Sequence, residues 1–266
     1  MTPFNRRAQI VLLAAALTPW AVPAFAQAPE RLSDKDVKAL IDQVDEGRDK
    51  FEGNLDGQFK GSTLRGPAGE TKVEGALQDY QDSTKKLQSR FNADYSASAE
   101  VATVLKQSTS IDTFMRGSSS PTKGRSEWDR QVLNLKRLAE AYGTTFPLSE
   151  GATVRRMNDK ETVAAAESVA TAADHLKDDI GKASTIAKPD REAAKKDVEA
   201  LAKQADTVKS RVNDGKPASG EVRQLVEQSA KVQAFVDAHP IPATAPNWKT
   251  VQSSVGKLQQ AFGLTK

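Results

Sequence analysis

The chain has 266 residues, enough for one or two domains, and its 38 Lys and Arg nearly balance its 35 Asp and Glu. Because no stretch concentrates basic residues into the positive face that a phosphate backbone requires, we expect no nucleic-acid partner. The chain contains no Cys, which excludes disulfides, thiolate metal sites and Cys nucleophiles, and we expect no cofactor. Aromatic residues make up only 6%, so the core must consist mainly of Leu, Val, Ile and Ala, which favours packed helices.

Residues 1–26 have the pattern of a secretory signal peptide. Arg6 and Arg7 precede a short apolar run, and Ala24-Phe25-Ala26 fits the small-x-small rule for cleavage. The alternative is a membrane anchor, but the apolar run forms a helix of only about 15 Å, half the thickness of a bilayer's hydrocarbon core. We therefore expect a periplasmic or secreted mature protein with no membrane span.

The strongest internal signal is self-similarity: segment 98–115 recurs at 219–236, which is 121 residues later. Blocks on either side also match, in the same order and at similar offsets: Trp128 with Trp248 downstream, and Asp34 with Asp159 upstream. Matching blocks in the same order predict a duplicated unit whose loops differ in length. We predict the signal peptide and then three segments: a first helical unit over 27–148, a linker over 149–158 and a second helical unit over 159–266.

The apolar residues of each unit recur at helical spacing of three and four, which predicts four helices in each unit and an all-α, bundle-like fold. Ser33, with Asp36 three residues later, predicts a capping box at the start of the first helix, and Ser126 with Asp129 predicts the start of the fourth. No segment alternates with period two for long enough to predict a strand. The expected helical stripes cover 37–55, 73–91, 101–115, 128–142, 163–180, 198–212, 222–235 and 248–262.

Glycine and proline mark the connections between these helices, at 61–69, 117–124, 215–217 and 239–242. A capped helix, an amphipathic helix and a terminal helix with Trp128, Leu135, Leu138, Ala139, Ala141, Tyr142 and Gly143 follow one another in the first unit. In this order the chain resembles a loose group of uncharacterised bacterial exported helical-bundle proteins. The resemblance implies a helical architecture and export, and it implies no site residues.

No constellation of catalytic residues is present, and we expect a protein that is not an enzyme. The chain has only two histidines, His175 and His239, and no Gly-x-Ser-x-Gly motif. One weak candidate for a metal site remains, because His175, Asp178 and Asp179 can share a helical face. A solvated acidic helix face accounts for the same spacing and is the preferred interpretation.

Arg48 breaks the apolar pattern of the first helix, since it lies seven residues after Ile41 and seven before Leu55. Asp45 and Glu52 flank it at helical spacing. These three residues are the candidates for an anionic ligand site between bundle helices. A snorkelling salt bridge explains the same pattern and is the preferred interpretation.

Two further pairs of residues recur in both units. Trp128 and Trp248 are in phase with the apolar stripes and are expected to be core anchors; exposed, they would instead indicate a binding surface. Gln107-Ser108 and Gln228-Ser229 place polar groups on the third stripe of each unit, where a buried hydrogen bond could fix the register of the helices.

The leading functional hypothesis is a non-enzymatic interaction or structural module of the cell envelope, whose partner would be another envelope protein. It depends on the repeated helical units and on the absence of a reactive constellation. The alternative is a periplasmic binding protein that holds a small anionic ligand or a metal between bundle helices. A closed interior would favour the first hypothesis, and a polar cavity around Arg48 the second.

Overall fold

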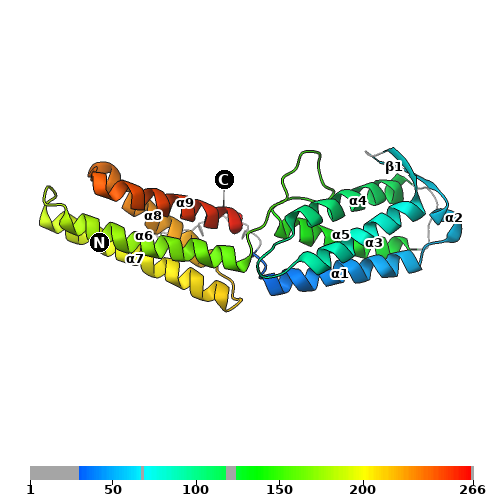
Figure 1. Ribbon diagram of the computed structural model, residues 1–266, viewed down its shortest axis with the longest axis horizontal. Helices are drawn as coiled ribbons and strands as arrows, with labels where there is room; N and C mark the ends of the chain where they lie inside the picture. The colour runs from blue at the N-terminus through cyan, green and yellow to red at the C-terminus, as the bar shows by residue number, and fades with distance from the viewer. Residues whose placement is uncertain (1–29, 67–68, 118–123, 265–266) are drawn as a thin grey trace, which may run out of the picture.

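The computed structural model describes residues 30–66, 69–117 and 124–264, so the predicted signal peptide lies outside the described residues (Figure 1). Eight long helices dominate the described chain, and the predicted all-α fold is confirmed. They form two four-helix bundles that lie end to end along the longest axis of the molecule (Figure 1). None of the described helices combines the length and apolar character needed to cross a membrane.

The first bundle is built from helices that pack in a ring, each against the helices that precede and follow it in the bundle. α1 also contacts α5, which closes the ring. A one-turn helix, α2 (Gly57–Lys60), follows α1. The four long helices are α1 (Asp34–Gly53), α3 (Val73–Arg90), α4 (Ser98–Gly117) and α5 (Arg125–Ala141).

The second bundle repeats this ring, with α6 contacting both α7 and α9 and α8 lying between α7 and α9. The shared order of contacts supports the internal duplication, which stays a prediction. The elements are α6 (Asp159–Lys182), α7 (Lys188–Asn213), α8 (Ser219–Ala238), a short 3-10 helix η1 (Pro242–Thr244) and α9 (Ala245–Ala261).

Each bundle has its own closed apolar core, in line with the predicted stripes. Trp128 anchors the first core, with its ring centroid 4.8 Å from that of Phe51 and 6.5 Å from that of Tyr80. Trp248 lies in the second core, where alanines of α6 and α7 take many of the buried positions. The two indoles are 1% and 6% exposed, so the prediction that both are core anchors is confirmed.

A β-hairpin lies in the connection between α2 and α3, where the sequence predicted no strand. β1 (Thr63–Gly66) pairs antiparallel with β2 (Gly69–Lys72), with Thr63 opposite Lys72. Strands of four residues are too short to produce a recognisable period-two pattern, and Gly66 and Gly69 have the same sequence signature as a break between helices. Leu64 is buried, so the hairpin also covers the end of the first core.

Two helix ends differ from the predicted ones. α1 ends at Gly53, although the apolar stripe continues to Leu55, because Asn54 caps the helix. α5 begins at Arg125, and Gly124 at its N-cap has a positive φ of 96°, so the expected capping role of Ser126 is wrong. Gly124 permits this backbone because it has no Cβ. The capping box of Ser33 and Asp36 is confirmed.

Candidate functional site

Arg48, the predicted centre of an anion site, is fully enclosed by the first bundle. Its side chain is 1% exposed, and Nη2 donates to Asp45 Oδ1 at 2.7 Å. Nη1 forms ion pairs with Asp49 at 2.8 Å and with Glu52 at 3.6 Å, neither in hydrogen-bonding geometry. Three carboxylates therefore surround one guanidinium, which is the local pairing that the sequence favoured, with Asp49 as an additional partner.

The Arg48 cluster continues into a buried polar network that joins three helices. Thr84 of α3 donates to Asp45 Oδ1 at 2.8 Å. On α5, Gln131 Nε2 donates to the Val44 carbonyl at 2.7 Å and to the Tyr80 hydroxyl at 2.6 Å. Burial raises the pKa of Tyr80 to about 12, and hydrogen bonds from Ser108 and Gln131 limit the rise. The network links α1, α3 and α5, as a structural polar cluster does.

Gln131 fits against α1 because position 47 is glycine. A Cβ on Gly47 would lie 2.1 Å from Gln131 Oε1, a distance that no side chain tolerates. Gln131 Oε1 itself is buried without a hydrogen-bond partner. No sequence pattern indicated this contact, since it joins helices whose residues are far apart in the chain.

The paired Gln-Ser positions join helices in both bundles, through different members of the pair. Ser108 donates to the Val104 carbonyl of its own helix, and Ser229 to the Val226 carbonyl. In the second bundle it is Gln228 that crosses between helices, donating to the Asp197 carbonyl at 2.9 Å. Ser108 also hydrogen-bonds the Tyr80 hydroxyl of α3, so in the first bundle the serine of the pair links two helices.

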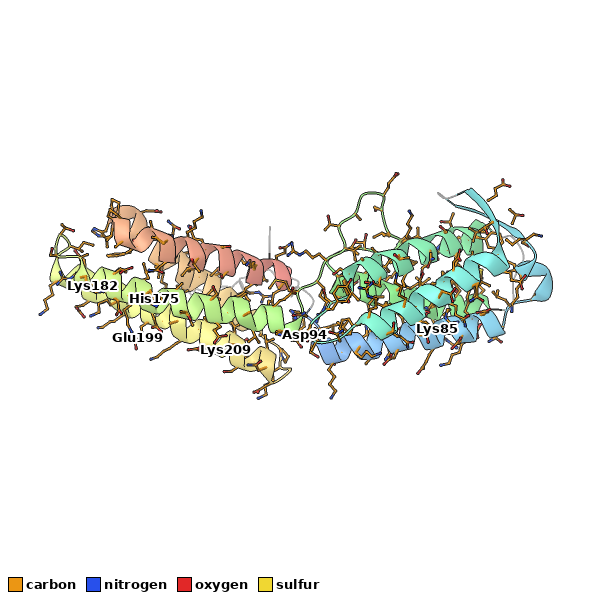
Figure 2. All side chains as sticks on the ribbon, in the orientation of Figure 1. Lys85, Asp94, His175, Lys182, Glu199 and Lys209 are labelled. Carbon is orange, nitrogen blue, oxygen red and sulfur yellow. The ribbon has the colours of Figure 1, made fainter. Side chains whose placement is uncertain are left out.

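The three candidate metal ligands lie on α6, where His175 can be located in Figure 2. His175 and Asp178 are exposed, and Asp179 accepts a hydrogen bond from Asn247 at 3.0 Å. Within residues 30–66, 69–117 and 124–264, no three His, Asp or Glu side chains gather as a metal site. The spacing is that of a solvated helix face, with one carboxylate used to hold α9.

The junction between the bundles holds the most elaborate charged arrangement of the described chain. Arg31 Nη1 donates to Asp159 Oδ1 at 2.6 Å, and Arg156 Nη1 donates in the same way to Asp34 Oδ1. The second guanidinium nitrogens reach the Met157 and Leu32 carbonyls, at 2.9 and 2.7 Å. Each bundle thus supplies an arginine to the aspartate and backbone of the other.

The backbone N–H groups at the junction also form reciprocal hydrogen bonds. Asp34 and Asp159 are the first residues of α1 and α6, and each carboxylate accepts the other's backbone N–H, at 2.8 and 2.9 Å. These N–H groups have no partner within their own helices, and a carboxylate there is also favoured by the helix dipole. The two helices therefore begin head to head, and the carboxylate of each binds the first N–H of the other, in addition to the helices' own N-cap residues, Ser33 and Asn158. We call these four side chains, Arg31, Asp34, Arg156 and Asp159, the junction clamp.

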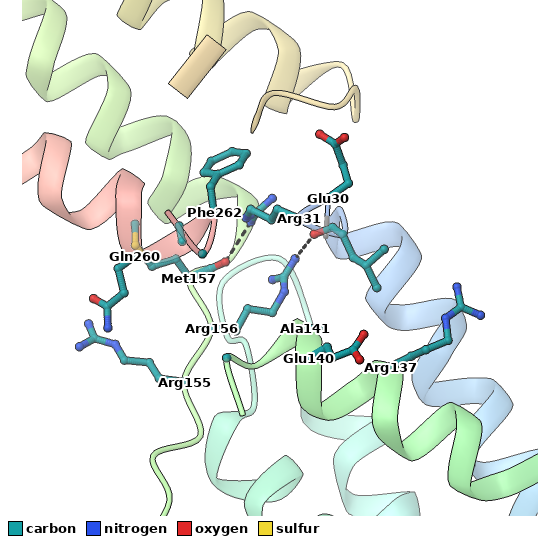
Figure 3. A pocket seen from close by; sticks show the side chains of 14 residues that line it. Glu30, Arg31, Arg137, Glu140, Ala141, Arg155, Arg156, Met157, Gln260 and Phe262 are labelled. Atoms are coloured by element: carbon teal, nitrogen blue, oxygen red, sulfur yellow. Dashed lines mark hydrogen bonds between the residues drawn. The ribbon is translucent and has the colours of Figure 1, made fainter. Parts of the chain in front are cut away.

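Beside the junction clamp lies a cleft of about 300 Å³, which Figure 3 shows from close by. Burial and the neighbouring Arg156 lower the pKa of Arg31, and Asp159 opposes that change. Arg31 also lies over the ring of Phe262, 5.7 Å from its centroid. The cleft is lined by side chains from both bundles and from the connection between them, among them Arg137, Glu140, Arg155, Gln260 and Phe262.

The junction clamp was not predicted, although the sequence contains a signal for it. Arg31 and Arg156 are separated by 125 residues, as are Asp34 and Asp159, so they belong to the same predicted repeat. Repetition shows that two positions correspond, and it does not show that they touch. Comparisons of the chain with models of protein families, with curated proteins and with solved structures found no significant match.

Proposed function

We propose that this protein is a non-enzymatic interaction or structural module of the cell envelope, which holds two helical bundles end to end as one body. The observation that carries the proposal is the junction clamp. Its arginine side chains are 8% and 3% exposed, and every member bonds across the junction. Charge-assisted hydrogen bonds at that level of burial are the strong ones, so the two bundles are expected to move together.

The closed interiors support the same proposal. The large side chains of both cores are buried, and the only arginine inside a bundle, among the described residues, is paired with three carboxylates. An internal ligand would have to displace those carboxylates and open the bundle. The outer helix faces are therefore the surfaces that this protein offers to other molecules, and repeated helical units commonly bind proteins with such faces.

Photo-crosslinking in the producing cell tests the proposal. A photoreactive residue replaces Leu133, which is exposed on α5, or Arg223, which is exposed on α8. We expect each probe to yield a discrete adduct with an envelope protein. The adducts should weaken when both Asp34→Asn and Asp159→Asn are introduced, because a partner that spans both bundles needs them held together.

Two outcomes would contradict the proposal. One is the absence of discrete adducts at exposed positions on both bundles. The other is turnover of a glycosidic, ester or peptide substrate that follows the purified protein and is lost with a single Asp or Glu substitution, since carboxylates alone can catalyse hydrolysis.

A further inference from the structure

The segment that precedes the first bundle reaches the second bundle through Glu30 and Arg31. Glu30 accepts a hydrogen bond from the hydroxyl of Ser219, at the start of α8, at 3.1 Å. The guanidinium carbon of Arg31 lies 5.7 Å from the centroid of the Phe262 ring, directly after α9. The second bundle thus holds this segment with the start of its third long helix and the end of its fourth.

The segment that precedes the second bundle is held by the first bundle in the same way. The backbone N–H of Arg155 donates to the Tyr142 carbonyl, directly after α5, at 3.1 Å. The backbone N–H of Arg156 donates to the hydroxyl of Ser98, at the start of α4, at 3.4 Å. Each bundle therefore holds the leading segment of the other with corresponding helix ends. The predicted repeat matches the residues involved, which are Ser98 with Ser219 and Tyr142 with Phe262.

This reciprocal face is what joins the two bundles. Over residues 30–66, 69–117 and 124–264, the two apolar cores share no residue, and the extensive contacts between helices lie within one bundle or the other. Separating the bundles would break the junction clamp and release the leading segments, but it would leave both cores closed. An interface that uses the same face on both halves is isologous, which is the arrangement of a symmetric dimer.

The connection between the bundles contains an exposed stretch between two anchored residues. Leu148 packs against the first core, and its N–H donates to Thr109 Oγ1 of α4 at 2.9 Å. Val154 also packs against the first core. Residues 149–153 between them, which we call the hinge, are mostly exposed. Fully extended, the chain from Leu148 to Val154 spans about 20 Å, nearly twice the diameter of a helix, so it can reach a chain that lies alongside.

A tight turn at Gly151 keeps the hinge closed. The N–H of Ala152 donates to the Ser149 carbonyl at 3.2 Å, and Gly151 has a positive φ of 74°. Glycine adopts this φ freely because it has no Cβ. A side chain at position 151 would meet no atom within 4 Å, so it would act on the backbone alone. It would disfavour the closed turn by about tenfold relative to an extended hinge.

We infer that a second copy of this chain binds at the junction by domain swapping. The second bundle of each chain docks on the first bundle of the other chain, and both hinges extend. Every contact of the junction clamp then forms between chains instead of within one chain, because the same residues meet. The inference rests on the clamp of the proposed function, and it assigns this face a defined partner, which is an identical chain.

The mass of the protein in solution tests the inference. Gly151→Val in the full mature chain should lower the dissociation constant of the dimer by about a hundredfold, because each dimer relieves two strained turns. Gly215→Val is the matched control, since Gly215 is exposed, has a φ of 65° and lies between α7 and α8, outside the hinge. The control should remain monomeric. Size-exclusion chromatography with light scattering measures both proteins over a range of concentrations.

Spin labels identify which bundles pair in the dimer. One batch of the Gly151→Val protein carries a label only at Lys85→Cys on α3, and another only at Glu199→Cys on α7, in a chain with no other Cys. Both positions are exposed and are labelled in Figure 2. In a swapped dimer formed from the mixture, the two labels should lie at the distance measured within one doubly labelled parent chain. Parent chains mixed at millimolar concentration should give the same distance without the substitution.

The inference is overturned if neither the Gly151→Val protein nor the concentrated parent mixture forms a dimer. It is also overturned if Gly215→Val dimerises as strongly, or if the distance between chains differs from the distance within the parent chain. A protein that stays monomeric does not contradict the interaction module, because photo-crosslinking of the outer faces needs no exchange. Absence of crosslinked adducts from a protein that does form the swapped dimer would contradict the module and not the exchange.

Discussion

At the scale of single residues, the two buried tryptophans occupy corresponding environments. Trp128 Nε1 donates to Asp112 at 3.0 Å, and Trp248 Nε1 donates to Gln233 at 2.8 Å. Asp112 and Gln233 are 121 residues apart, as the predicted repeat requires. Burial of both indoles was predicted from their spacing, whereas the acceptors could not be, because an acidic and an amide residue share no sequence pattern.

Truncating either tryptophan tests how much the two cores depend on it. Trp128→Ala and Trp248→Ala should each lower the free energy of unfolding by roughly 3–5 kcal/mol, through lost burial and a cavity. Chemical denaturation followed by circular dichroism measures the change. A loss below about 0.5 kcal/mol, as for a surface substitution, would mean that the side chain is not packed.

Gly47 provides a second residue-scale prediction. Gly47→Ala should lower the free energy of unfolding by about 1–3 kcal/mol, because the new methyl group collides with the buried amide of Gln131. Gly256→Ala in α9 is the matched control, since a Cβ there meets nothing within 4 Å. The free energy of unfolding of the control should rise by up to about 1 kcal/mol, because Ala has a higher helix propensity than Gly. Equal gains in both variants would contradict the contact.

Tyr80 predicts an alkaline weakness of the first bundle. Its pKa is raised to about 12 from an ordinary value of 10.0, mainly by burial, so the folded state holds the proton more tightly than the unfolded chain. The stabilisation is complete below about pH 10 and disappears as the pH rises toward 12. At 1.36 kcal/mol for each pKa unit, the loss is about 2–3 kcal/mol.

The measurement is the free energy of unfolding as a function of pH. Tyr80→Phe should have a shallower decline above pH 10 than the parent protein, because its buried ring does not ionise. Leu133→Ala, at an exposed position on α5 that does not ionise, should leave the decline unchanged. Parallel curves for the parent and Tyr80→Phe would exclude Tyr80 as the cause.

At the scale of elements, helical periodicity was sufficient to predict the eight long helices, because each buries one apolar stripe. The hairpin of β1 and β2 was not predicted, because its strands are too short for an alternation of apolar and polar residues to be detected. The network of Arg48, Thr84 and Gln131 was predictable only in part. Local ion pairs follow from spacing along one helix, while contacts between α1, α3 and α5 depend on how the helices pack.

The Arg48 cluster predicts non-additive effects on stability. Arg48→Met should lower the free energy of unfolding by roughly 3–5 kcal/mol, because it leaves the half-buried Asp45 without its cation. Adding Asp45→Asn should restore part of the loss, since an apolar or neutral replacement of a whole buried pair is often tolerated. The second bundle supports this expectation, because Ala173, at the position that the predicted repeat pairs with Arg48, is buried without any charge.

A double-mutant cycle measured by chemical denaturation provides the test. Additive losses from Arg48→Met and Asp45→Asn would mean that the two side chains do not interact. Glu46→Gln is the control on α1, because both Glu46 and its partner Lys50 are about 70% exposed and their ion pair contributes little.

At the scale of the whole molecule, the junction clamp decides whether two bundles behave as one body. The predicted repeat matched Asp34 with Asp159, and Arg31 and Arg156 are separated by the same 125 residues. The head-to-head arrangement of the two helices depends on tertiary packing and was not predicted. Each carboxylate of the clamp accepts hydrogen bonds from two donors of the other bundle. Neutralising both carboxylates should therefore loosen the whole junction.

Spin labels on the two bundles report this rigidity. Lys85 on α3 and Glu199 on α7 are exposed, are labelled in Figure 2, and can be changed to Cys in a chain that has no other Cys. Electron–electron double resonance should give a narrow distance distribution for the parent protein. Asp34→Asn with Asp159→Asn should broaden it, because each charged hydrogen bond lost costs about 1.5–3 kcal/mol.

A surface pair across the same junction provides the matched control. Lys160 and Asp94 are 2.6 Å apart but about 73% and 72% exposed, so solvent screens their attraction. Asp94→Asn should therefore leave the distance distribution narrow. If it broadens the distribution as much as the double substitution, the buried clamp is not what holds the bundles together. If the parent distribution is already broad, the protein is a flexible tandem, and the proposal of a module with two bundles at fixed orientation fails.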